Sequence, residues 1–431
     1  MTFKIHNRPE TKTIQTFDIP ESQVLTLSSG HQVHLSNPCN IGVVRVELFW
    51  ASGSYHQEKP YVATMANDLL LSGNEHRTEF EVIEYLDYLG ATHRTECGHM
   101  GSSVVIRASK KNILSVFKWV IENIHAATYP ENEVESAKLV RAASLERQQK
   151  TPKYWSSRIA LESLYGKDHT LGIHGDPIDY QKVTSENLNL FKKQHFGLEK
   201  MMLLVSGDSD DQLLHSFADA LRPFPGTPLS IIQEQFTETF PKFEKPLMHP
   251  VDGTNQVNLH LAKHIKPKDQ QERFGLTLLN LVLGGYFGSR LMQILREERG
   301  LTYGVGSYFK PAFNDYTWTI SGDLKSETAE EAIRVVHEIF EDLKKNILPD
   351  DELNKIKQYY AGQFRGGFDG PFSMGGKYQH ALYRGLDLSY YTTVLPGIWS
   401  VTAQEVNVLA NNYLNPNSFI HVLSGDTPKQ R

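Results

Sequence analysis

The sequence predicts an α+β fold made of two related, layered α/β-sandwich domains that follow one another along the chain. Each half alternates short strands, such as residues 43–50 and 256–262, with amphipathic helices. One helix–strand–turn pattern also occurs twice at a fixed spacing. The length of 431 residues supports this division, because single domains usually hold about 100–200 residues.

The repeat is clearest near the end of each half, where a Val-Thr pair begins a predicted helix, a strand follows, and the strand stops at Ser-Gly-Asp. These markers are Val183-Thr184 and Ser206-Gly207-Asp208, then Val401-Thr402 and Ser424-Gly425-Asp426. The offset is 401 − 183 = 218 at the first marker and 424 − 206 = 218 at the second, about half the chain. This period is much longer than that of a solenoid, so we expect two structural copies.

A second pair of matching elements lies earlier in each copy. A helix over residues 78–89 is predicted by a capping box at its start, from a threonine to the glutamate three positions on, and by Gly90 at its end. Its counterpart is residues 289–299, followed by Gly300. The repeat therefore extends through both halves.

The copies are joined by a proline-rich stretch that favours extended backbone. We expect an N-terminal domain over residues 1–222, a linker over 223–250 and a C-terminal domain over 251–431.

Composition and charge exclude several classes of protein. Hydrophobic residues make up 40% of the chain, which is typical of globular proteins, and the net charge of −6 argues against nucleic-acid binding. No apolar run reaches the ~18–20 residues of a membrane span. The first ten residues lack the apolar core of a signal peptide, so we expect a cytoplasmic protein. Its two cysteines cannot form a disulfide framework.

Two motifs in the second half carry a resemblance to a known family. Leu281–Leu291 (LVLGGYFGSRL) and Leu295–Tyr303 (LREERGLTY) closely resemble the C-terminal half of the pitrilysin/insulinase-type inverted zincin peptidases. Residues 69–92, the helix that contains residues 352–355, and both strand–Gly-Asp endings fit the same family, from about residue 24 to residue 426. The resemblance implies one half of a clamshell, with two such halves enclosing a chamber for extended peptides.

The resemblance also implies that the family's zinc site is lost in this chain. Active members carry His-x-x-Glu-His on a helix, where the two histidines bind zinc and the glutamate activates a water molecule. Here Thr64 and Asp68 take the histidine positions and Asn67 takes that of the glutamate. A further glutamate ligand on a later helix falls at Ala143 or Ser144. We therefore expect no cofactor in this chain.

Arg296 and Tyr303 match an Arg/Tyr pair that active family members use to hold the peptide at the zinc ion. A guanidinium donates to peptide carbonyls, and a phenol can donate to the oxyanion of a tetrahedral intermediate. The chain is thus similar to the zinc-less subunit of bacterial heterodimeric members, in which the partner supplies the zinc. The resemblance implies a heterodimer with a zinc-bearing subunit, peptide substrates, and no activity of this chain alone.

Two alternatives stay open. Family members without a full site also serve as structural or interaction subunits of larger assemblies, which have no need of Tyr303. A relocated metal site is the other alternative, because His93, Cys97 and His99 would share one face of an extended strand. The same segment also resembles the family's strand beside the cleft, to which peptides add as an extra strand.

Overall fold

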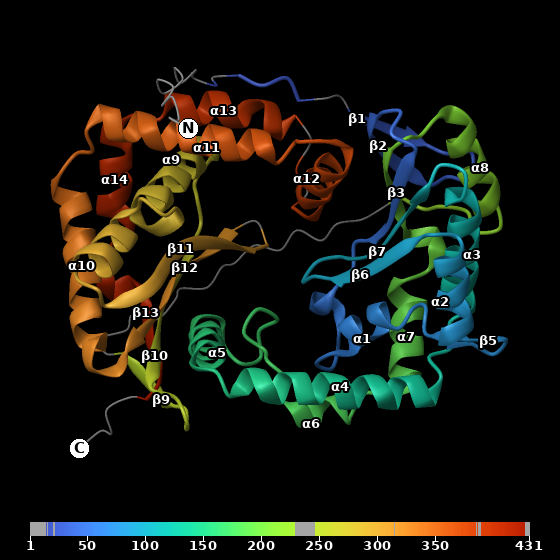
Figure 1. Cartoon of the computed structure of the whole chain (residues 1–431), viewed down its shortest axis with the longest axis horizontal. Helices are drawn as coiled ribbons and strands as arrows, with labels where there is room; N and C mark the ends of the chain where they lie inside the picture. The colour runs from blue at the N-terminus through green and yellow to red at the C-terminus, as the bar shows by residue number, and fades with distance from the viewer. Residues whose placement is uncertain are drawn as a thin grey trace, which may run out of the picture.

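The computed structural model describes residues 14, 16–19, 22–228, 246–313, 315–384, 386 and 389–426. It contains two α+β domains, the N-terminal one on the right and the C-terminal one on the left of Figure 1. Each domain has one open main sheet with helices packed against it. The predicted fold class is confirmed.

The N-terminal domain is built on a six-stranded sheet of order β1-β2-β8-β3-β7-β6. Its strands are β1 (Ser22–Thr26), β2 (Gln32–Pro38), β3 (Val43–Trp50), β6 (Thr92–Cys97), β7 (Ser102–Ser109) and β8 (Met202–Gly207), beside a small ribbon of β4 (Gly73–Asn74) and β5 (Arg77–Thr78). Its helices are η1 (Ser54–His56), α1 (Val62–Asp68), α2 (Glu79–Tyr88), α3 (Ile113–Ala126), α4 (Glu131–Gln149), α5 (Pro152–Tyr165), α6 (Pro177–Tyr180), α7 (Ser185–His195), η2 (Leu198–Lys200) and α8 (Asp211–Leu221).

The C-terminal domain is built on a five-stranded sheet of order β11-β12-β10-β13-β9. Its strands are β9 (Leu247–Pro250), β10 (Gln256–Ile265), β11 (Thr302–Ala312), β12 (Asp315–Lys325) and β13 (Ile420–Gly425). Its helices are α9 (Gln270–Asn280), η3 (Leu281–Gly285), η4 (Met292–Glu298), η5 (Ser326–Thr328), α10 (Ala329–Lys345), α11 (Asp350–Gly366), α12 (Pro371–Tyr383), α13 (Tyr390–Ser400), α14 (Ala403–Tyr413) and η6 (Pro416–Ser418).

The two sheets share one topology. The order β2-β8-β3-β7-β6 in the first copy corresponds to β9-β13-β10-β12-β11 in the second. In both, the first pair of strands is parallel and the remaining pairs are antiparallel. The duplication predicted from the two sets of markers is therefore present in the strand order as well, with β1 as an addition to the first copy.

Each copy places one helix on the sheet of the other copy (Figure 1). Helix α5 packs on β10 and β13, where Ala160 and Leu164 join an apolar cluster with Ile420 and Val422. Helix α12 packs on β8 and β2, and its Met374 belongs to the same apolar cluster as residues of β3 and β8. This exchange ties the two domains together, and no sequence pattern predicts it.

One domain boundary differs from the prediction. Leu247–Pro250, placed in the linker, forms strand β9 and pairs with β13. The C-terminal sheet thus begins before residue 251, because an extended, proline-containing segment can serve as an edge strand. Residues 229–245 of the predicted linker lie outside the described residues.

The earlier pair of helices follows the prediction in one copy and departs from it in the other. In α2, Thr78 and Glu81 form the expected capping box, and Gly90 follows in the left-handed region at φ 64°. In the second copy the chain is helical from residue 290 to 298, but Met292–Glu298 forms π-helical turns before Gly300 at φ 62°. No helix among the described residues is both long and apolar enough to cross a membrane.

Candidate functional site

The residues at the family's zinc-motif positions lie on α1, which packs against β6, β7 and α7. Thr64 is half-buried and Asn67 is fully buried. The Asn67 side-chain amide donates to the Ser103 carbonyl oxygen of β7 at 3.3 Å. Asn67 therefore holds α1 against the sheet, and an amide cannot accept a proton from water as a glutamate does.

Asp68, at the end of α1, is held from two sides. The Thr95 hydroxyl on β6 donates to its Oδ1 at 2.8 Å, and Arg141 of α4 donates from Nη2 to its Oδ2. The pair is partly shielded, since the Asp68 side chain is 17% exposed and that of Arg141 37%. The cation beside Asp68 is thus a guanidinium of the same chain.

The prediction of the lost site named Ala143 and Ser144 but missed Arg141, which stands on the same helix. Ala143 is exposed and Ser144 half-buried, and neither supplies a carboxylate. Among the described residues no three or more His, Cys, Asp or Glu side chains are placed to hold one metal ion. The donor set at the motif positions therefore does not fit zinc.

The alternative metal ligands lie along β6 and the turn after it. His93 is the second residue of β6 and Cys97 is its last. Burial raises the pKa of the Cys97 thiol, which disfavours the thiolate that a metal requires. His99 lies beyond the strand, within 3.2 Å of the Ser54 hydroxyl at Nδ1 and 3.4 Å of the Thr170 hydroxyl at Nε2. Both ring nitrogens of His99 thus have hydroxyl partners.

Arg296 and Tyr303 line one pocket of about 280 Å³ at the start of β11. Tyr303, the second residue of β11, is 82% exposed, and the Arg296 side chain is 35% exposed. The other polar side chains of this pocket, which we call the Arg/Tyr pocket, are Gln256, Glu297, Thr302, Asp323 and Lys325. The structure brings the two predicted residues together at an open surface.

Two neighbours contact the Arg296 guanidinium. Glu297 lies 3.1 Å away, measured from Oε1 to Nη1, and the ring of Phe287 lies under the guanidinium carbon at 5.0 Å. The Tyr303 hydroxyl has no hydrogen-bond partner among the residues described. Both side chains keep donors available to a ligand.

The π-helical turns account for the position of Arg296. After α2, the Ala91 amide donates to the carbonyl oxygen of Leu86, five residues earlier. In the second copy, the Leu301 amide donates to the carbonyl oxygen of Leu295, six residues earlier. The second copy thus holds one extra residue between the buried leucine and the strand. Such π-turns often occur at functional sites, and here the extra residue lies in the turn that carries Arg296.

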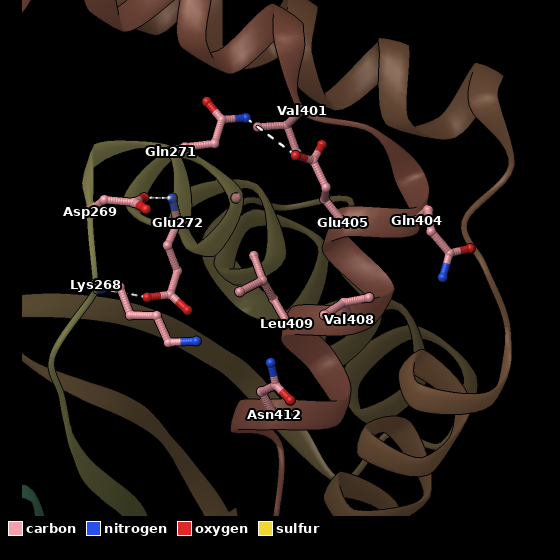
Figure 2. A pocket seen from close by; sticks show the side chains of 11 residues that line it. Lys268, Asp269, Gln271, Glu272, Val401, Gln404, Glu405, Val408, Leu409 and Asn412 are labelled. Carbon is pink, nitrogen blue, oxygen red and sulfur yellow. Dashed lines mark hydrogen bonds between the residues drawn. The ribbon is translucent and has the colours of Figure 1, made fainter.

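A larger groove of about 320 Å³ runs between α9 and α14 (Figure 2). The carboxylates of this groove already accept hydrogen bonds from backbone amides at the starts of the two helices. Asp269 accepts from the Glu272 amide at 2.8 Å, and Glu272 accepts from the Lys268 amide at 2.5 Å. Glu405 belongs to the capping box of α14. The groove holds none of the predicted site residues, so the Arg/Tyr pocket is the better candidate.

Comparisons with known proteins agree with the motifs. Residues 182–360 match the family model described as the peptidase M16 inactive domain. The non-peptidase homolog YmxG of Helicobacter pylori is 24% identical over 305 residues, 69% of each chain. The crystal structure of a peptidase M16 inactive domain from Pseudomonas fluorescens has a TM-score of 0.83 at 23% identity and covers 95% of this chain and 99% of its own.

The periplasmic protease PqqL of Escherichia coli has a TM-score of 0.74 at 15% identity; the likeness covers 100% of this chain but only 49% of PqqL. Fold, motifs and relatives thus agree with the resemblance drawn from the sequence. Residues 182–360 match the inactive domain of the M16, or pitrilysin/insulinase-type, peptidase family, and the fold of the chain is similar to that of the solved M16 inactive domain.

Proposed function

We propose that this chain is the non-metal subunit of a heterodimeric zinc metallopeptidase and completes the active site of a zinc-bearing partner from the same family. The observation that carries the proposal is the Arg/Tyr pocket, where Arg296 and Tyr303 lie together and open to solvent. Exposed arginine and tyrosine side chains of this kind are common where a ligand or a second chain completes a site.

The zinc-motif positions Thr64, Asn67 and Asp68 on α1, which we call the N-terminal centre, differ from the Arg/Tyr pocket in a way that supports the same proposal. Asp68 is paired with Arg141 and Asn67 is buried in the α1–β7 contact, so the motif positions do not provide a ligand set for zinc. A peptidase that contains this chain therefore needs its metal from elsewhere. The likeness to PqqL fits this arrangement, because one copy of this chain matches about half of that protease.

The chemistry of the two residues suits the substrate of such an enzyme. The fork of donors on Arg296 would bind carbonyl oxygens of an extended peptide. The Tyr303 hydroxyl would donate to the oxygen that becomes negative during attack on the peptide bond. Hydrolysis itself would take place at the partner's zinc ion, and this chain would orient the peptide and stabilise charge.

The test is to capture the partner with the tagged full-length chain and to follow cleavage of quenched-fluorescent peptides by the complex. We expect no turnover by the chain alone and a loss of about 10²–10³-fold in kcat for Arg296→Ala and for Tyr303→Phe, as for other oxyanion donors. Tyr88→Phe is the matched control, since Tyr88 is also 82% exposed but lies on α2. Normal turnover by both variants in an intact complex would contradict the proposal.

A structural or interaction subunit is the second candidate, favoured by the relative named a non-peptidase homolog and by the closed N-terminal centre. It predicts that Arg296→Ala and Tyr303→Phe change neither assembly nor any activity of the assembly. The same two variants therefore separate the two functions.

A further inference from the structure

The loop before η4 places an aromatic ring against Arg296. Phe287 is 68% exposed, and its ring centre lies 5.0 Å from the guanidinium carbon of Arg296. Removing this ring would empty no part of the core. The contact that the structure gives this ring is instead the one with Arg296.

The loop is anchored on both sides of Phe287. The ring of Tyr286 packs on that of Tyr359 of α11 with centroids 5.0 Å apart, and Arg290 forms an ion pair of 2.8 Å with Glu352, also on α11. Gly288 allows the tight turn, because a Cβ there would lie 2.8 Å from the Tyr286 ring. Phe287 thus stands on a short segment fastened to one helix.

The remaining contact of Arg296 cannot orient the guanidinium by itself. Glu297 is the next residue on the same turn and its side chain is 57% exposed, so the ion pair is screened by water. One contact at Nη1 also leaves the plane of the group free to rotate. An aromatic ring next to the guanidinium restricts this rotation and leaves free the N–H donors that do not point toward the ring.

We propose that Phe287 is a positioning residue that holds the Arg296 guanidinium flat, with its donors directed toward the peptide in the Arg/Tyr pocket. This inference rests on the proposed function, because it assumes that Arg296 binds substrate. It adds a residue to the site through contact with Arg296 rather than with substrate.

The first experiment measures turnover of quenched-fluorescent peptides by the complex with variants of Phe287. Phe287→Leu keeps an apolar side chain without a π face, and we expect kcat/KM to fall about two- to five-fold. Phe287→Trp should restore the rate, since indole binds cations best. In the Arg296→Ala background, Phe287→Leu should have no further effect, because its action passes through Arg296.

A second experiment needs no partner. NMR of the full chain with labelled arginine follows the Arg296 side chain, assigned with Arg296→Lys. Stacking predicts ring-current shifts and slow rotation of the guanidinium, both lost in Phe287→Leu and kept in Phe287→Trp. Phe80→Leu is the control, because Phe80 is 72% exposed on α2 and should change neither measurement.

The outcomes separate the two proposals. If Arg296→Ala slows turnover but Phe287→Leu does not, or if Phe287→Leu and Phe287→Trp lower it equally, the positioning role is wrong and the proposed function stands. If Arg296→Ala leaves turnover normal, the proposed function is wrong and the role of Phe287 in turnover falls with it. Unchanged Arg296 signals in Phe287→Leu would also overturn the stacking.

Discussion

The turn that carries Arg296 and Tyr303 has a counterpart in the N-terminal copy, and the two differ in a small number of residues. In both, a helix ends at a glycine with positive φ and the next strand begins at a threonine. His93 stands in the first copy where Tyr303 stands in the second, and the segment from the buried leucine to the strand is one residue longer in the second copy. The same topology therefore presents different chemistry through one turn.

The end of the preceding helix differs as well. When segment 69–73 is aligned with segment 281–285, Asn280 of the second copy corresponds to Asp68 of the first. Asn280 is buried, and its side-chain oxygen accepts from Ser307 at 2.7 Å and from Trp318 at 3.0 Å. Asp68 instead pairs with Arg141. At this position the second copy has a neutral hydrogen-bond network and the first copy has an ion pair. In both copies the side chain is already bonded to neighbours within the chain.

Zinc content tests the closed state of the N-terminal centre and has the largest expected effect. The Arg141 guanidinium is paired with the Asp68 carboxylate, and the other motif positions lack zinc-binding side chains. We therefore expect far less than one zinc ion per purified chain. Elemental mass spectrometry without chelators measures this, with an active M16 enzyme as control. One tightly held zinc per chain would contradict the closed centre and would direct attention to His93, Cys97 and His99.

Acid should unfold both copies together, because each contributes a helix to the other. Burial lowers the pKa of His34 on β2 to about 4 and that of His260 on β10 to about 3. Between these values and the unfolded pKa near 6.5, the unfolded state binds more protons, so stability is full above pH 6.5 and falls as the pH drops toward 4. Full protonation would remove roughly 3 kcal/mol of stability at His34 and roughly 5 kcal/mol at His260.

Circular dichroism across pH 7 to 3 checks this prediction. One transition is expected, and His34→Gln or His260→Gln should make stability less dependent on pH below 6.5. His215→Gln is the control, since His215 is exposed on α8. Two separate transitions would show that the exchange of α5 and α12 does not couple the copies.

Comparing Arg141→Leu with Arg296→Leu tests whether Arg141 stabilises the fold while Arg296 does not. Loss of the ion pair leaves Asp68 with Thr95 alone, and we expect a decrease of about 1 kcal/mol in the free energy of unfolding, since the pair is only partly shielded. Arg296→Leu should change that free energy by less than about 0.5 kcal/mol. Urea unfolding of both variants measures the difference; equal losses would mean that Arg296 is as structural as Arg141.

An effect as small as that of Arg141→Leu is expected at the two glycines that end the helices. Gly90 and Gly300 both have positive φ, and a Cβ at either would meet no atom within 4 Å. Alanine should therefore cost each copy about 1 kcal/mol of backbone strain alone. Gly300→Ala should also slow the complex, because it lies between Arg296 and Tyr303, whereas Gly90→Ala should not. Equal turnover in the two variants would mean that the π-turn has no role in the activity of the complex.

Features encoded within a few neighbouring residues were predictable. The capping box of Thr78 and Glu81 and the glycines that need positive φ depend on one turn of chain, so their pattern is visible in sequence and present in the structure. The duplication was visible for the same reason, because the copies keep these local signals at one spacing. The family motifs added Arg296 and Tyr303 and the altered zinc motif.

The sequence by itself thus determined the two-copy α+β architecture and the resemblance to the family, and it predicted Arg296, Tyr303 and the altered zinc-motif positions. Only the tertiary structure decided that α5 and α12 cross to the opposite sheets, that Arg141 closes on Asp68 from 73 residues away, and that Phe287 lies under Arg296. The physical reason is that a helix with an apolar face has no local preference for one sheet over another, and a charged side chain none for one partner over another. Those choices depend on the path of the whole chain and on which surfaces it leaves to be buried.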